Sequence, residues 1–226
     1  MKPHFWTWTA LSLACSIAAA SEPERPELVD ARKIDPTLIV AAAYASKDNF
    51  TGQIVPGYEA AKCLLTRPAA EALKRIQKKL SARGYGLKLF DCYRPAAAVR
   101  YFAGAWLQSP DQSTRSKHYP SFESKMDLFK NGFISSDSKH ARGSTVDLTL
   151  VRKKDRKELE MGTCFDFFGP EATWAANATL SQTARENRER LREAMAPEFE
   201  PYEAEWWHFR LKSDPYSGPM LEVPVR

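Results

Sequence analysis

Apolar side chains recur with helical spacing in three stretches of the chain. Over residues 66–83 they fall three or four positions apart, which is the pattern of one buried helix face. Thr66 can cap this helix, and Gly84 is a residue type that commonly follows a helix end. Similar spacing predicts helices over residues 181–195 and from Pro95 to near residue 110.

Other stretches alternate between apolar and polar positions, as strands do. Residues 86–91, 146–151 and the aromatic-rich 204–211 predict three strands. In residues 146–151 the apolar side chains share one face, and Asp147 lies on the other. Residues 37–44 are apolar and are expected to be buried. Helical and strand patterns follow one another without a repeat or a linker, which predicts a single α+β domain.

The first twenty residues have the pattern of a secretory signal peptide. A short basic start precedes an apolar stretch and the small residues 18–20, so we expect cleavage after Ala20 and export, to the periplasm. An N-terminal anchor is one alternative. A lipoprotein attached through Cys15 is another, and it is disfavoured because Ser12 stands where a lipobox normally has leucine.

The remaining chain divides into two parts. Residues 21–36 are rich in proline and glutamate and are expected to be a mobile lead-in, and residues 37–226 are expected to form the catalytic domain. No apolar run in the mature chain approaches the roughly 18 residues that a membrane span requires.

Composition excludes several classes of protein. Of the 226 residues, 43% are hydrophobic and 27% are charged, so the chain is not disordered, collagenous or of low complexity. The net charge of +5 is spread along the sequence, which argues against a nucleic-acid partner. Four arginines in residues 181–195 alternate with glutamates and therefore predict a solvated helix face. They are Arg185, Arg188, Arg190 and Arg192.

Three cysteines remain after removal of the signal peptide. They are Cys63, Cys92 and Cys164. An odd number allows at most one intramolecular disulfide and leaves one thiol free, and the sequence does not decide which two pair. None of them lies in a CxxC pair, so a cysteine-ligated zinc site is not expected.

Two histidines and an aspartate have the character of a metal site. His140 and Asp147 flank Gly143, which permits a sharp turn, and His208 lies far along the chain. Together they would supply three ligands and leave a fourth position for water, as in catalytic zinc sites. Taken singly, each histidine could be a structural imidazole and Asp147 a hydrogen-bonded carboxylate on the face of a strand.

Two further side chains have the chemistry of peptide hydrolysis. Glu205, three residues before His208, could take a proton from metal-bound water. A regular strand would place the two on opposite faces, so a bulge or twist is needed. Glu203 is the competing carboxylate. Arg94, between a strand and a helix, could stabilise an oxyanion, and its alternative is a surface ion pair.

These residues occur in motifs with a recognisable order. The motifs are Tyr93-Arg94-Pro95, Ser138-x-His140-x-x-Gly143-x-x-x-Asp147 and Glu205-x-x-His208. This combination resembles the VanX-type zinc D-alanyl-D-alanine dipeptidases, which are related to the zinc D,D-carboxypeptidases and the hedgehog signalling domain. Residues 44–52, beginning Tyr44-Ala45, and 161–166 resemble the dipeptidase branch, and the similarity extends over about residues 37–211.

The resemblance implies a fold, a site and a substrate class. The fold would be a central, mostly antiparallel sheet flanked by helices. One Zn2+ would be bound by His140, Asp147 and His208. Glu205 would act as general base and acid, and Arg94 would stabilise the tetrahedral intermediate. Asp166, with Ser138, would hold the free ammonium group of the substrate.

The implied reaction is hydrolysis of D-alanyl-D-alanine, or a similar short D-amino-acid dipeptide, in peptidoglycan-related metabolism. One alternative is a D,D-carboxypeptidase or L,D-type peptidase that acts on longer stem peptides. Another is a non-catalytic zinc fold that binds peptidoglycan or a protein. Stereochemical preference and oligomeric state are left open by the sequence.

Overall fold

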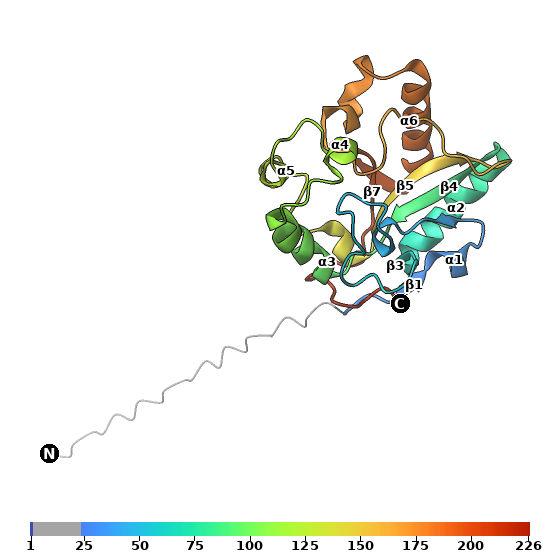
Figure 1. Ribbon diagram of the computed structural model, residues 1–226. Helices are drawn as coiled ribbons and strands as arrows, with labels where there is room; N and C mark the ends of the chain where they lie inside the picture. Colours follow the sequence, from blue (N-terminus) through green and yellow to red (C-terminus); the bar gives the residue numbers. More distant parts are fainter. Residues whose placement is uncertain (2–23) are drawn as a thin grey trace.

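A five-stranded sheet lies at the centre of the molecule in the computed structural model, which describes Met1 and residues 24–226 (Figure 1). Its strand order is β2-β4-β5-β7-β6, with β2 parallel to β4 and every other neighbour antiparallel. The predicted, mostly antiparallel sheet is therefore confirmed. The strands are β2 (Ile39–Val40), β4 (Tyr85–Asp91), β5 (Thr145–Arg152), β6 (Phe199–Tyr202) and β7 (Glu205–Leu211).

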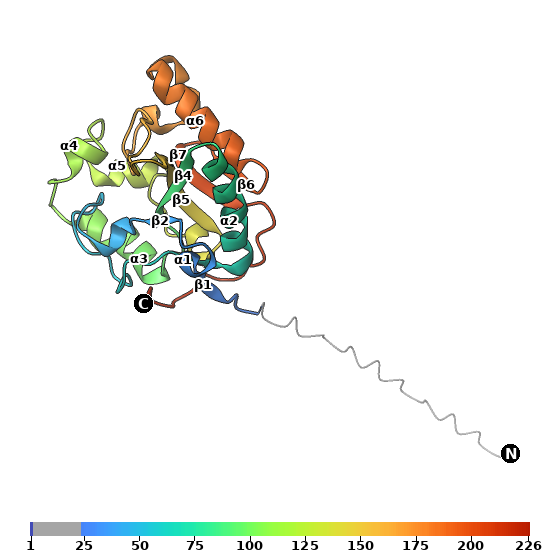
Figure 2. The same cartoon turned by 90° about the vertical axis from the view of Figure 1, so that its right-hand side faces the viewer.

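Two long helices cover one face of this sheet (Figure 2). They are α2 (Arg67–Ala82) and α6 (Gln182–Met195), and both match predicted helices. Their buried side chains pack on the strands in a largely aliphatic core. Members of this core are Leu73, Ile76 and Leu80 of α2, Val146, Leu148 and Leu150 of β5, and Leu191 and Met195 of α6. The helical spacing of apolar residues in the sequence therefore predicted the two helices of this layer.

The opposite face is covered by short helices and loops (Figure 2). These are α3 (Ala96–Tyr101), the π-helical turn η2 (Phe102–Trp106), α4 (Arg115–His118) and α5 (Lys125–Lys130). Aromatic rings dominate this second core, among them Tyr44, Phe50, Phe102, Trp106 and Tyr119. Asp147 is directed away from the aliphatic face, as predicted, and is buried at 2% exposure.

The expected mobile lead-in ends earlier than the composition of residues 21–36 suggested. Over part of that range the chain forms β1 (Leu28–Asp30) and α1 (Ala31–Ile34), and β1 pairs antiparallel with β3 (Leu64–Thr66). The Asp30 side chain caps α1 by accepting from the backbone N–H of Arg32, and Ala31 is fully buried. This short segment was not predicted from the sequence, because the surrounding prolines and glutamates dominate the composition of residues 21–36. Residues 2–20 of the predicted signal peptide, including Cys15, lie outside the described residues.

Four short 3-10 segments complete the secondary structure of the described residues. They are η1 (Ala43–Ala45), η3 (Lys139–Arg142), η4 (Pro170–Ala172) and η5 (Trp174–Ala178). Within residues 24–226, no helix has both the length and the apolar content needed to cross a bilayer.

Arg188 departs from the solvated face predicted for α6. It is only 1% exposed, and burial lowers its pKa to about 10. Its guanidinium donates to three backbone carbonyls at 2.7–3.0 Å, those of Met161, Glu171 and Thr173. The alternation of arginine and glutamate did not reveal this role, because the acceptors come from a distant loop. Arg188 thereby anchors residues 161–173, the loop that carries Asp166.

Candidate active site

The three predicted metal ligands meet at one end of the sheet. His140 comes from η3, and Asp147 and His208 are direct partners on β5 and β7. Asp147 Oδ1 lies 3.2 Å from His140 Nε2 and 3.1 Å from His208 Nδ1, and the two histidine nitrogens are 3.2 Å apart. Two imidazole nitrogens and one carboxylate oxygen therefore converge on a single point.

The turn that joins His140 to β5 depends on glycine. Gly143 has a φ of +86°, a left-handed conformation that costs other residues energy. A Cβ atom at this position would also lie 2.6 Å from Leu28 Cδ2, so a side chain here would force Leu28 to move. Gly143 thus allows His140 to fold back over the strand that carries Asp147.

The donor set fits a divalent metal ion. Asp147 Oδ1 is buried and has no hydrogen-bond donor among the described residues, although both imidazoles face it. An uncompensated buried carboxylate oxygen is costly, and a cation shared with the two nitrogens would remove that cost. His140 Nδ1 lies 2.7 Å from the backbone carbonyl of Cys92. Since a carbonyl only accepts, Nδ1 carries the proton and the Nε2 lone pair is free to bind metal.

Electrostatics keep the triad carboxylate charged. Burial alone would raise the pKa of Asp147, but electrostatic attraction to the imidazoles of His140 and His208 outweighs burial and holds that pKa below its usual range. Burial would likewise lower the pKa of His208, and the contact with Asp147 reverses this and raises it. A buried carboxylate oxygen that faces two imidazole nitrogens offers the same attraction to a metal ion.

Glu205 joins this cluster through an irregularity in β7. The β6–β7 register shifts beside Pro201 and Tyr202, which is the bulge that the sequence required. As a result Glu205 Oε2 lies 3.5 Å from His208 Nδ1. Burial raises the pKa of Glu205 to about 7, a value suited to a group that takes and returns a proton near neutrality. The competing Glu203 has a 74% exposed side chain and lies outside the cluster.

Arg94 is a buried group rather than a surface ion pair. Its side chain is 16% exposed, and its Nη2 atom lies 3.6 Å from Asp147 Oδ2. The guanidinium also lies over the rings of Tyr44 and Phe102, at 5.2 and 5.4 Å from their centroids. These contacts hold a positive charge beside the triad.

Asp166 occupies a strained, buried position facing the same space. Its φ is +57°, and it is 4% exposed. The Tyr44 hydroxyl donates to Asp166 Oδ2 at 2.9 Å, and His118 Nδ1 lies 3.0 Å from the backbone oxygen of Asp166. Burial, aided by the charge of Asp147, raises the pKa of Asp166 well above its usual range. Asp166 would therefore gain from a cationic ligand, which would stabilise its charged form.

One cavity of about 270 Å³ connects all of these groups. Every site residue predicted from the sequence lines it: Arg94, Ser138, His140, Asp147, Asp166, Glu205 and His208. Its apolar wall includes Phe50, Val99, Phe133, Ile134 and Phe168. A small cavity with charged groups at fixed positions fits a compact, polar ligand.

Similarity to known proteins covers this whole region. Residues 24–226 match the peptidase M15 family, described as D-ala-D-ala dipeptidase. This chain belongs to the peptidase M15 family. A protein named D-alanyl-D-alanine dipeptidase from Enterococcus faecium is 38% identical over 187 residues, which are 82% of this chain and 91% of that protein. A protein of the same name from Streptomyces coelicolor is 37% identical over 186 residues, which are 81% of this chain and 91% of that protein. A third, from Escherichia coli (strain K12), is 33% identical, and the matched region is 82% of this chain and 84% of that protein.

Sequence reasoning missed one buried carboxylate in this M15 peptidase. Asp91, at the end of β4, is 3% exposed and accepts from Arg94 Nε at 2.9 Å and from the Tyr58 hydroxyl at 2.6 Å. Its Oδ2 atom also lies 3.6 Å from His140 Nδ1. Asp91 therefore positions both Arg94 and His140. The available signal was its place at a predicted strand end, three residues before Arg94.

The role of Tyr44 was likewise not assigned from sequence. Tyr44 is 1% exposed, donates to Asp166 and packs against the Arg94 guanidinium. It therefore contacts both of these charged groups of the cavity wall. The tyrosine belongs to a segment that resembles the dipeptidases, but nothing in that segment indicates a partner 122 residues away.

Proposed function

We propose that this M15 peptidase is a zinc-dependent dipeptidase that hydrolyses D-alanyl-D-alanine or a similar short D-amino-acid dipeptide. The observation that carries the proposal is the position of Glu205, whose carboxylate lies 3.5 Å from His208 beside the cluster of His140, Asp147 and His208. A site that merely held a metal would have no need of a buried acid next to it. The names of the relatives supply the substrate.

His140, Asp147 and His208 would hold the zinc ion. Two nitrogens and one carboxylate oxygen are a frequent ligand set of catalytic zinc, which leaves a coordination position open. Zinc bound there would lower the pKa of water to about 7 and polarise the peptide carbonyl. The contact of His140 Nδ1 with the Cys92 carbonyl and the pairing of Asp147 with His208 orient two of the ligands.

Glu205 would accept the proton of the attacking water and then deliver it to the leaving amine. Its carboxylate lies beside the proposed ligands, where it could make both transfers. Arg94 would stabilise the negative charge that develops on the carbonyl oxygen. Its position is fixed beforehand by Asp91 and by the rings of Tyr44 and Phe102, so little reorganisation is needed during the reaction.

Asp166 and Ser138 would receive the free ammonium group of the dipeptide. Asp166 is buried and has only the Tyr44 hydroxyl as a side-chain donor among the described residues, so a cationic substrate group would complete its partners. A peptide with a blocked N-terminus would leave Asp166 unpaired. This favours a dipeptidase over a carboxypeptidase that acts on longer stem peptides.

Lys139 would bind the carboxylate end of the same dipeptide. It lines the cavity beside His140 and, within the part of the chain that the structure describes, makes no ion pair. Arg94, which also lines the cavity, is assigned to the carbonyl oxygen in this proposal. Lys139 is thus the cation available for the second terminus of the zwitterion.

A panel of alanine dipeptides of all four stereochemistries, assayed with and without a chelator, tests the proposed reaction. We expect hydrolysis of the D,D dipeptide, loss of activity with the chelator and recovery with zinc. N-acetyl-D-alanyl-D-alanine should be cleaved far more slowly, because its amide cannot pair with Asp166. Equal rates on the acetylated and free dipeptides would favour the carboxypeptidase instead.

We also propose that the protein acts after export to the periplasm, where it would recover D-alanine from peptidoglycan turnover. The signal pattern of the first twenty residues supports this, and so does the disulfide between Cys63 and Cys92, since such bonds persist in oxidising compartments. Cell fractionation with detection of the mature chain tests the location. Recovery of the protein in the cytoplasm alone would contradict it.

A further inference from the structure

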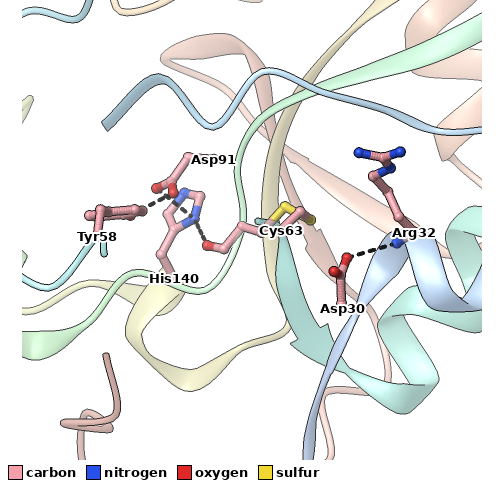
Figure 3. The surroundings of a disulfide bond; sticks show 7 residues. Asp30, Arg32, Tyr58, Cys63, Asp91 and His140 are labelled. Carbon is pink, nitrogen blue, oxygen red and sulfur yellow. Dashed lines mark hydrogen bonds and ion pairs between the residues drawn. A yellow bond between two sulfur atoms is a disulfide. The ribbon is translucent and has the colours of Figure 1, made fainter. Parts of the chain in front are cut away.

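A disulfide joins two segments close to His140, one of the candidate metal ligands (Figure 3). Cys63, immediately before β3, is bonded to Cys92, immediately after β4, while Cys164 remains free. Both bonded cysteines are buried, at 2% and 3% exposure. The sequence left this pairing open among its three candidates.

Cys92 is embedded among residues of the site. Asp91 precedes it and Arg94 follows two positions later, and its own carbonyl accepts from His140 Nδ1 at 2.7 Å. The next residue, Tyr93, donates its backbone N–H to the Leu64 carbonyl at 2.8 Å. A covalent bond and a hydrogen bond therefore tie the end of β4 to the same short segment.

That segment also contacts the turn that follows His140. The backbone N–H of Thr66 donates to the Gly143 carbonyl at 2.7 Å, and the hydroxyls of Thr66 and Ser144 are 2.8 Å apart. Strand β3 thus touches both the acceptor of the His140 proton and the turn that carries His140. If β3 were no longer tied to Cys92, the Cys92 carbonyl and the turn that carries His140 could move independently of each other.

We infer that the Cys63–Cys92 disulfide is a positioning element for the metal ligand His140. It keeps the Cys92 carbonyl against Nδ1 and so directs Nε2 towards the metal. Residues that orient a ligand in this way typically change metal affinity by about 10- to 100-fold when altered. The inference rests on the proposed metal-binding role of His140 and adds to it that zinc affinity depends on the redox state of Cys63 and Cys92.

The double variant Cys63→Ala/Cys92→Ala tests this in the mature chain. We expect its zinc dissociation constant, measured by competition with a chelator, to rise at least about tenfold. Leu80→Ala is the matched control, because Leu80 is a buried residue of α2 and belongs to the aliphatic core. This control should lower the unfolding temperature and leave zinc affinity unchanged. A cysteine variant that loses stability but binds zinc as tightly as the unaltered chain would overturn the inference.

Reduction of the unaltered protein provides a second measurement if the variant fails to fold. A water-soluble phosphine supplies two electrons: the S–S bond breaks, water provides a proton to each sulfur and its oxygen to phosphorus, and two additional thiols per chain become titratable. The reduced, folded protein should bind zinc more weakly, and by linkage bound zinc should protect the disulfide from reduction. Unchanged affinity after complete reduction would contradict the inference. Unchanged zinc affinity in His140→Ala would instead refute the proposed metal site.

Discussion

The two faces of the central sheet are both buried, yet they bury different chemistry. Beneath α2 and α6 the buried side chains are almost entirely apolar, and most of them are aliphatic. On the other face, Asp91, Asp147 and Asp166 are buried together with Arg94 and a group of aromatic rings. The first face has the composition of a core that stabilises the fold by removing apolar surface from water.

The polar face shows what a catalytic arrangement costs in stability. Each buried charge there needs a partner, and the described partners are few: Arg94 serves two carboxylates, and Asp147 Oδ1 has no hydrogen-bond donor among the described residues. A metal ion and a zwitterionic substrate would supply the missing charges. We therefore expect changes on the aliphatic face to alter stability alone, and changes on the polar face to alter chemistry and metal binding.

Glu205→Gln should give the largest effect. Removal of the proposed proton acceptor should lower kcat by about 10²- to 10⁴-fold. Zinc content should stay close to that of the unaltered protein, because the proposed ligands are His140, Asp147 and His208. Steady-state hydrolysis and metal analysis measure the two quantities. Glu203→Gln is the control, and its exposed side chain predicts no loss. Full activity in Glu205→Gln would mean that another group is the base.

Leu73→Ala should affect the aliphatic face alone. Leu73 is fully buried in α2, and truncation of such a side chain costs about 2–5 kcal/mol of unfolding free energy. Denaturant unfolding measures the loss, and KM for the dipeptide, measured well below the unfolding temperature, should stay the same. A large change in KM would show that the two faces are coupled more tightly than their contacts indicate.

The pH dependence of stability should reveal the buried acid in protein stripped of metal. Burial raises the pKa of Glu205 from 4.5 to about 7, so the folded state holds its proton more tightly than the unfolded state does. This contribution to stability is present below pH 4.5 and is lost as the pH rises through 7. Glu205→Gln should therefore match the unaltered chain at pH 4 and exceed it by roughly 3 kcal/mol at pH 8. A difference that does not vary with pH would exclude the raised pKa.

Lys139→Met should give the smallest effect. Loss of a charge-assisted contact with the substrate carboxylate should raise KM for the dipeptide by roughly 10-fold. The C-terminal amide of the same dipeptide lacks that carboxylate, so its KM should be the same in both proteins. Steady-state kinetics on both substrates separates this role from a general disturbance of the cavity, which would raise KM for the amide as well.

Many of the site residues could be predicted because they occur in motifs with fixed spacing. His140 and Asp147 flank Gly143, and Glu205 lies three residues from His208, so local geometry limits how far apart they can be. The required bulge in β7 also followed from counting side chains along a strand. Asp91 was missed because its partners, Tyr58, Arg94 and His140, mostly come from other segments.

The sequence by itself determined the long helices, the main strands and the residues able to bind a metal, because helical and strand periodicity and motif spacing are local properties. Only the tertiary structure decided the pairing of Cys63 with Cys92, the contact of Tyr44 with Asp166 and the burial of Arg188. Each of these joins segments tens of residues apart or more. Such contacts depend on how the helices and loops pack around the sheet, and the local pattern of apolar and polar residues does not predict that packing.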